Sequence, residues 1–477
     1  MLIGGISVPF AERYAAHQIK AEIERDGQGS VGTVEVGLFG RRVVLDNFKS
    51  HGDGELEARR WEASGLSVSL TDLLEGRTPF SGFRPGDPLR AERVELTDVR
   101  YAPPGSSERW SAASIVVKGL DLARYDAATS GTARLPVQTA RIAAALTVRS
   151  VVATKVVYVV PGKGDTVGIR QIEVEAIDHG KIGKIRVSDL DATPKAAAEE
   201  SFKVAEIRAS ALDLGGVARR LASGAWRVGQ PLGRIDLGEA RASGFGGLLM
   251  SQYGVSLDAV SLETSHDPAG SRKSRFRIDG LTFKVGRDRE TARFGMLLQA
   301  MGLRELALGF DCSGDERRAK GELAIENCTL AAADLANVAL GAGFVDADEA
   351  FWRAVDEGRP IDIARSSIAL GSAKLAIIDK GVIERVAGAV AAATHEPPAA
   401  TRAKLAQDIR SFQPPDVLIT EGLTKLLDTV ARFVEQGGTL VIEARPEPPF
   451  GLANAGRLSR PGVDLVSLFG LSARLAR

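Results

Sequence analysis

The 477-residue sequence is poor in the residues that most catalytic and metal sites need. It has five histidines, two cysteines and 5% aromatic residues, and HExxH, CxxC and GxSxG motifs are missing from it. Metal sites and catalytic triads depend on histidine, cysteine and carboxylates at set spacings, so we expect no metal, no cofactor and no enzymatic activity. The histidines lie far apart, and we interpret them as surface or turn residues: His17, His51, His179, His266 and His395.

An excess of charge and a long hydrophobic run are missing as well. Basic and acidic residues number 61 each, so the net charge is zero and nucleic acid is not expected as a partner. A membrane-spanning helix needs about 20 apolar residues in a row, and the sequence has no such run. Two interpretations of the apolar start, residues 1–6, stay open. It is either the end of a membrane anchor encoded upstream or an ordinary N-terminus whose Ile3 and Ile6 pack on the core.

Three short motifs look chemical at first and have simpler interpretations. Residues 161–166 carry glycine, lysine and threonine, but a phosphate-binding loop needs Gly-Lys-Ser/Thr in that order, so we predict a hairpin turn. The acidic pairs Asp189/Asp191 and Asp346/Asp348 have the composition of a glycosidase or cation site. Asp-x-Asp is also common in turns and helix caps, and we assign these pairs no function.

The two cysteines, Cys312 and Cys328, are predicted to be free thiols. Cys312 shares its parity with Leu306, Leu308 and Phe310, whereas Cys328 has the opposite parity from Leu323 and Ile325. If both strands are regular, the two sulfur atoms point to opposite faces of the sheet, and a disulfide does not form.

What the sequence does contain is alternation of apolar and polar residues. Residues 9–25 have helical spacing, after which Val34, Val36 and Leu38 alternate and predict the first strand of a hairpin. Similar alternation continues to about residue 310, and the 52 glycines suit many turns. Near the C-terminus the spacing predicts helices over 382–393, 401–412 and 423–436 and a strand over 439–442.

We therefore predict a mainly β fold with peripheral helices (α+β). The expected architecture is an elongated, curled antiparallel sheet of degenerate repeats, with an N-terminal helix and a C-terminal helical cap. The predicted domains are residues 1–125 (helix and first β-repeat region), 126–245 (second region), 246–375 (third region) and 376–477 (helical cap with a final strand).

The repeat prediction depends on two recurring sequence patterns. The first is Arg-Trp followed by a strand and Leu-x-Asp-Leu or Leu-Asp-Leu, and it is seen near Trp61 and Trp110. The second is Gly-x-Pro before a returning strand, at 86–88, 229–231 and 358–360. Trp226 and Trp352 stand just before the last two copies. For the tryptophans, core packing is the expected role ahead of a stacking surface for sugars.

This layout resembles the AsmA-like envelope proteins. The resemblance lies in the N-terminal helix, the hairpin over Gly32–Phe39 and Val43–Phe48, and the Leu-rich strands of Leu303–Leu330 around a polar hairpin. It extends over residues 9–375 in pattern. The family consists of periplasmic proteins with a membrane anchor and a long curled β-sheet, and this sequence departs from it by showing no anchor.

The resemblance implies a non-enzymatic protein of the periplasm or cell envelope that binds or conducts lipid acyl chains along an apolar β-groove. Its role would be lipid transport or outer-membrane homeostasis, its partners lipid, membrane or other envelope proteins, and its attachment an inner-membrane anchor outside this sequence. The alternative is a structural or interaction scaffold of packed β-units without a groove. The side chains expected to line the groove are Val34, Val36, Leu38, Phe276, Ile278, Phe283, Leu306, Leu308 and Phe310.

Overall fold

The computed structural model describes most of the chain, in two compact units. Unit 1 comprises Met1–Leu248 and unit 2 comprises Leu249–Arg477. The residues described are 3–25, 27, 29–51, 54–79, 86–103, 107–127, 134–160, 165–195, 200–222, 235–267, 270–284, 292–414, 417–459 and 462–476.

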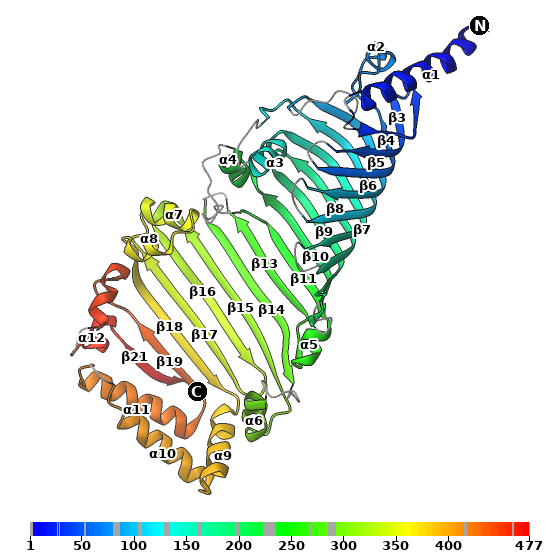
Figure 1. Cartoon of the computed structure of the whole chain (residues 1–477). Coiled ribbons are helices and arrows are strands. Elements are labelled where there is room, and N and C mark those ends of the chain that lie inside the picture. The colour runs from blue at the N-terminus through cyan, green and yellow to red at the C-terminus, as the bar shows by residue number, and fades with distance from the viewer. Residues whose placement is uncertain are drawn as a thin grey trace. The chain divides into compact units, whose positions relative to one another are not determined.

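Unit 1 is an antiparallel sheet in which nearly every strand pairs with the next strand in the chain (Figure 1). Its elements are α1 Ile3–Glu24, β1 Gly29–Ser30, β2 Thr33–Gly37, β3 Arg42–Ser50, β4 Glu55–Ser64, α2 Leu70–Leu74, β5 Leu89–Ala102, β6 Arg109–Leu122, α3 Arg134–Ala145, β7 Leu146–Val159, β8 Thr166–Asp178, β9 Lys181–Thr193, β10 Phe202–Asp213, α4 Gly215–Ala222 and β11 Glu239–Gly246.

Unit 2 begins within α5 and is also an antiparallel sheet, with most of its helices after β17. Its elements are α5 Leu248–Gln252, β12 Val255–Ser256, β13 Ala259–His266, β14 Arg272–Lys284, α6 Ala292–Ala300, β15 Glu305–Arg317, η2 Arg318–Lys320, β16 Glu322–Ala332, β17 Ala336–Val345, α7 Glu349–Asp356, α8 Pro360–Arg365, β18 Ala369–Asp379, α9 Val382–Thr394, α10 Pro398–Arg410, α11 Glu421–Gln436, β19 Thr439–Ala444, β20 Phe450–Gly451, η3 Leu452–Ser459, α12 Leu465–Phe469 and β21 Ser472–Ala476.

The mainly β fold with an N-terminal helix is confirmed. The hairpin predicted after the first helix is formed by β2 and β3. The three helices expected near the C-terminus are α9, α10 and α11, and the strand that follows them is β19. These elements were predictable because apolar residues recur at helical or strand spacing within each segment.

The best-defined core of unit 1 lies under α1. Ala15 and Ile19 of this helix are fully buried, and they pack in one cluster with Val36, Val43 and Leu45. The helix thus covers one face of the first strands. Leu38, in the turn after β2, donates its backbone N–H to the carboxylate of Glu12 at 3.1 Å, which ties that turn to the same helix.

The two sequence patterns do not mark one recurring structure. Gly86–Pro88 does precede a strand, β5, but Gly358–Pro360 precedes the helix α8, so the strand expected there is wrong. Proline stands at the first position of α8, where its missing N–H costs no hydrogen bond. Trp352 lies in the helix α7, whereas Trp61 lies in a strand. Residues 229–231 and Trp226 lie outside the described residues.

The prediction of two free thiols is wrong, because Cys312 and Cys328 form a disulfide across β15 and β16. The two residues are direct partners in the register. A β-bulge shifts the register between Ile325 and Cys328, so the parity of β16 changes at this point. The parity argument assumed regular strands and therefore placed the second sulfur on the wrong face.

The hairpin turn was predicted at residues 161–166, between the antiparallel partners β7 and β8. At the ends of this segment the backbone N–H of Val160 donates to the carbonyl of Asp165 at 2.8 Å. Residues 161–164 themselves lie outside the described residues.

Candidate functional site

One face of the unit 1 sheet is apolar along two continuous rows of directly paired residues. Every member of both rows is Ala, Val, Leu, Ile or Trp. The first row is Val34, Leu45, Trp61, Leu96, Ile115, Ala153, Ile172, Val187, Ile207 and Ala242. The second row is Val36, Val43, Ala63, Val94, Val117, Val151, Val174, Ile185, Ala209 and Ala240. We call this surface the apolar face of unit 1.

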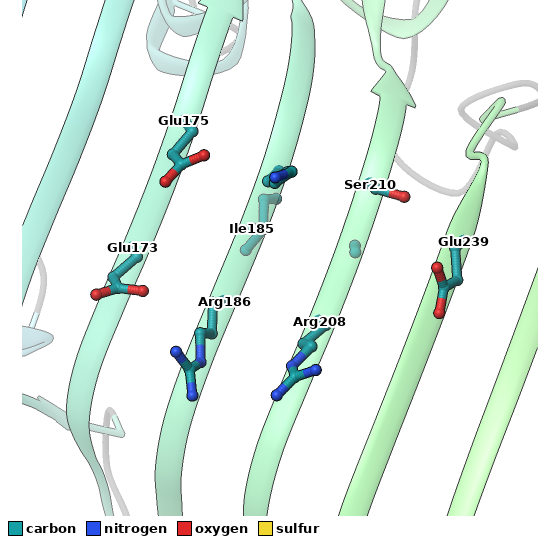
Figure 2. Close-up of a pocket in the computed structure, with 9 residues that line it drawn as sticks. Glu173, Glu175, Ile185, Arg186, Arg208, Ser210 and Glu239 are labelled. Atoms are coloured by element: carbon teal, nitrogen blue, oxygen red, sulfur yellow. The ribbon is translucent and has the colours of Figure 1, made fainter.

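The residues between these rows point to the opposite face, which is mostly polar and charged. Figure 2 shows part of it, a shallow cavity of about 460 Å³ lined by side chains of β8, β9, β10 and β11. Arg186 and Arg208 each lie 2.6 Å from the carboxylate of Glu206. Hydrogen bonds from Arg208 and Arg186 hold the pKa of Glu206 below its ordinary value. The lowered pKa keeps Glu206 ionised at neutral pH, and its two arginine partners are exposed, as in an ordinary surface ion pair.

Two lines of backbone kinks cross the unit 1 sheet. The first line, kink column 1, consists of Asn47, Arg59, Asp98, Ala113, Lys155, Arg170, Asp189, Ala205 and Gly244, which fall at the gaps in the register. Kink column 2 consists of Gly65, Glu92, Gly119, Arg149, Ala176, Gly183, Ala211 and Gly238. In each strand the two columns are six positions apart, as Arg170 and Ala176 are in β8.

The kinks alternate between neighbouring strands. In column 1, φ is positive at Asn47, Asp98, Lys155, Asp189 and Gly244. In column 2, φ is positive at Gly65, Gly119, Ala176 and Ala211. A left-handed residue interrupts the pleat and bends its strand, so two aligned columns bend the sheet along two parallel lines.

Burial on the apolar face varies along the two kink columns. Val99 is 6% exposed, Val156 8% and Val204 4% beside column 1, and Val148 is 2% exposed beside column 2. In β8, Ile169 and Ile177 beside the kinks are half-buried, as is Ile172 midway between the columns. We call the apolar face of β5–β11 between and beside the columns the trough.

Unit 2 has an apolar face of the same kind, without aligned kinks. Its first row is Val260, Ile278, Phe310, Leu330, Val338, Ile377, Leu440 and Leu475. Its second row is Leu262, Phe276, Cys312, Cys328, Leu340, Leu375, Ile442 and Ala473. The disulfide thus lies in the second row, and we call this surface the apolar face of unit 2.

The centre of the unit 2 face is exposed to solvent. Leu330 is 43% exposed and Leu340 is 42% exposed, although both lie on inner strands of the sheet. Toward the β15–β16 turn the same face is covered, because Phe344 packs against a cluster that includes Phe351 and Trp352 of α7. Exposed apolar side chains grouped in the middle of a sheet make this face a candidate binding surface.

The nine side chains predicted to line a groove fall into two groups, one in each unit. Val34, Val36 and Leu38 lie in unit 1 in the cluster under α1, where Val36 is 9% exposed. The other six lie together on the apolar face of unit 2 and are half-buried. Their register is Phe283 opposite Leu306 and Ile278 opposite Phe310, with Leu308 between them, and the rings of Phe276 and Phe310 are 5.9 Å apart. Groove lining remains a prediction for all nine.

The trough residues of β5–β11 were not selected from the sequence, although a signal for them exists. Each strand from β5 to β10 contains a nine-residue pattern, apolar-x-x-apolar-x-apolar-x-x-apolar. In β8 it is Ile169, Ile172, Val174 and Ile177. The two x-x steps mark the kink columns, because a kink places two consecutive side chains on the polar face. A search for strict alternation misses this pattern at both steps.

The remaining chemical candidates have structural roles. Asp348 caps α7 by accepting the backbone N–H of Phe351 at 2.8 Å, as expected for a helix cap. Asp189 pairs with Arg170 at 2.6 Å, and Asp191 pairs with Lys203 at 2.9 Å. Within the described ranges, histidine, cysteine and carboxylate side chains form no group of three that could hold a metal ion. A search of the same residues for a helix long and apolar enough to cross a membrane finds none.

A family model described as an uncharacterized protein matches residues 329–474, which lie within unit 2. No curated protein matches the chain.

Proposed function

We propose that this protein is a non-enzymatic protein of the cell envelope that binds lipid acyl chains along the apolar faces of its two units. The observation that supports the proposal is the run of uninterrupted apolar rows, half-buried in the unit 1 trough and open at Leu330 and Leu340 in unit 2. A sheet with one polar face and one apolar face needs something apolar against the second. An acyl chain meets that need without specific polar contacts.

The energetics favour a chain-like ligand. Each methylene removed from water contributes about 0.8 kcal/mol. About ten methylenes against these rows would contribute on the order of 8 kcal/mol before the costs of ordering the ligand. Because the rows repeat from strand to strand, a chain would find nearly the same surface at each step. Such a surface suits both holding an acyl chain and letting it slide.

The disulfide supports a location outside the cytoplasm. Disulfides form and persist in oxidising compartments such as the periplasm. The Cys312–Cys328 pair is consistent with the periplasmic location that the resemblance to AsmA-like proteins implies. A role in lipid transport or outer-membrane homeostasis, with membrane or envelope partners, follows from the same proposal.

The first test compares two exposed apolar residues on opposite faces of unit 2. Leu340 is 42% exposed on the apolar face, and Ile378, on the adjacent strand, is 39% exposed on the other face. Leu340→Asp should reduce co-purified lipid about tenfold or more, because burying a leucine against a chain is worth about 1.5–3 kcal/mol. Ile378→Asp is the matched control and should retain its lipid. Native mass spectrometry followed by organic extraction measures both variants.

A second pair tests unit 1 in the same way. Val151 belongs to the apolar rows, and the next residue, Val152, lies on the polar face opposite Glu173. Val151→Asp should lose lipid and Val152→Asp should keep it, with circular dichroism showing that both variants are folded. Wild-type protein that carries no lipid after purification, and takes up none from vesicles, would contradict the proposal. It would favour the scaffold, in which a partner protein covers these faces.

A further inference from the structure

The two long edges of the unit 1 trough differ in their side chains. The outermost row beyond kink column 1 is Leu56, Tyr101, Trp110, Tyr158, Val167, Ala192 and Phe202. The rows beyond kink column 2 are aliphatic: Leu89, Leu122 and Leu146 form one, and Val148, Ile177, Ile182 and Leu212 form the other. We call the first edge the aromatic rim and the second the aliphatic edge.

The aromatic rim has a compact centre on three adjacent strands. Trp110 of β6 is paired directly with Tyr101 of β5 and with Tyr158 of β7. The ring centroids of Trp110 and Tyr158 are 4.2 Å apart and their planes are inclined by 31°. Trp110 is 41% exposed, so part of its indole remains available to a ligand.

Three helices lie at the other edge, whereas α5 begins at Leu248, beside Ser201 at the aromatic-rim edge. The helices α2, α3 and α4 all belong to connections at the aliphatic edge, where α3 and α4 pack against each other (Figure 1). Ala140 of α3 and Ala218 of α4 are buried there. Among the described residues, the connections at the aromatic rim contain no helix between β5 and β8. Trp110 of the aromatic rim is 41% exposed, whereas Leu122 of the aliphatic edge is 7% exposed, so the rim is the more accessible edge at these strands.

We infer that the aromatic rim contacts the ester region, between acyl chains and headgroup, of a bound diacyl phospholipid. The rim would also be the edge over which the lipid enters the trough. This inference depends on the proposed function. Tryptophan and tyrosine prefer the boundary between apolar and wet surroundings, because each ring has an apolar body and one polar group. An acyl chain on the apolar rows would then point away from Trp110, and its ester and phosphate groups would lie at the rim in water.

Fluorescence quenching by labelled phospholipids tests this orientation. The full-length protein, freed of lipid, would be loaded from vesicles of a phospholipid brominated either next to the ester or near the methyl end. The contribution of Trp110 is the difference between the wild type and Trp110→Phe. We expect the ester-proximal label to quench this contribution more strongly, and the methyl-end label to quench more strongly a tryptophan placed in the trough by Ile172→Trp.

Transfer kinetics give a second, independent readout. Trp110→Ala combined with Tyr158→Ala should slow uptake of a fluorescent phospholipid from vesicles by about two- to tenfold, the range for losing aromatic contacts. The final amount bound should fall less than the rate. Val157→Ala is the matched control, because Val157 is adjacent to Tyr158 in β7 but on the polar face, and it should leave the rate near that of the wild type.

The outcomes separate the inference from the proposed function. Lipid that binds but quenches the Trp110 contribution equally from both label positions, or most strongly from the methyl end, overturns the rim assignment and leaves lipid binding intact. Unchanged uptake in the Trp110/Tyr158 variant overturns the rim as the edge where lipid enters. Absence of bound lipid in every sample overturns the proposed function, and the rim assignment with it.

Discussion

Both units have an apolar face of the same kind, but they differ in their backbone kinks and in how much of that face is exposed. In unit 1 the kinks are aligned in two columns, the register is kept across them, and some apolar residues beside the kinks, such as Val99 and Val148, are buried. In unit 2 the irregularities are single β-bulges that do not align between neighbouring strands, such as those between Ile278 and Leu281 and between Gly343 and Phe344. There Leu330 and Leu340 stay more than 40% exposed.

This difference shows how a single-layer sheet can shield an apolar face without a second layer. A kink in one strand bends only that strand, whereas kinks aligned over many strands bend the whole sheet along a line. Isolated bulges add local twist and leave the face open. The unit 1 trough would thus hold a chain on three sides, and unit 2 would offer a more open surface.

The largest expected effect concerns the disulfide, which occurs in unit 2. The two cysteines are 16 positions apart, and closing a loop of that size stabilises a fold by about 3 kcal/mol in the chain-entropy model. Cys312→Ala with Cys328→Ala should therefore speed hydrogen exchange in β15 and β16. The strands β7–β10 of unit 1 should keep their protection. If the unfolded, unreduced wild type reacts with two equivalents of a thiol reagent, the disulfide is absent and this prediction fails.

The next effect tests whether the kinks hold the unit 1 sheet in its shape. Gly119 of β6 has φ 62°, and a Cβ added there would lie 3.0 Å from the Cβ of Arg149. Gly119→Val should destabilise unit 1 by about 1–3 kcal/mol, because a β-branched residue is strained at this φ.

The matched control for this substitution is in unit 2. Gly309 of β15 has open space where a Cβ would stand, and its φ is not in the left-handed region. Gly309→Ala should stabilise the protein by about 0.4–1 kcal/mol, because alanine restricts the unfolded chain. Chemical denaturation measures both changes. Equal effects of the two substitutions would mean that the kinks play no special part in unit 1.

The smallest effect is a difference in acid sensitivity. Asp315 of β15 is 1% exposed, and its carboxylate accepts hydrogen bonds from the Ser271 hydroxyl at 2.6 Å and from Arg317 at 2.8 Å. These bonds lower the pKa of Asp315 below its ordinary value of 3.8. A carboxyl with a lowered pKa stabilises the fold above the unfolded-state pKa of about 3.9, and this contribution is lost as the pH falls through the folded-state pKa.

Asp315→Asn should therefore cost about 1 kcal/mol near pH 7, the difference between a charged and a neutral hydrogen bond. As the pH falls below about 4 the difference should begin to shrink, and it should vanish below the folded-state pKa of Asp315. Hydrogen exchange of β14 and β15 as a function of pH measures this. A constant difference between the two proteins down to pH 2 would show that the charge of Asp315 is not the cause.

The elements of both sheets could be predicted better than the connections between them. Helical spacing in α1 and α11 and alternation in β2 and β3 are local signals, and each lies within one segment. The Gly-x-Pro pattern failed because the same residues suit the first turn of a helix and the start of a strand. Gly358–Pro360 lies at the start of the helix α8, and Gly86–Pro88 lies just before the strand β5.

The sequence predicted the apolar character of the candidate site but only some of the residues that form it. Apolar residues on one face of β14 and β15 were expected, and the structure places Phe276, Ile278 and Phe310 there together. The pairing of Cys312 with Cys328 could not be found by parity, because one bulge reverses the alternation. The trough residues follow a nine-residue pattern that is visible in each strand, but its meaning appears only when neighbouring strands align.

The sequence by itself determined which segments are strands and helices and which side chains share a face of a strand, because side-chain direction has a fixed local period. Only the tertiary structure decided that the kinks form two columns, that α1 covers Val36, and that Leu340 stays exposed. Each of these depends on contacts between residues far apart in the chain. Such contacts are set by register and packing between strands, and the composition of any one strand does not specify them.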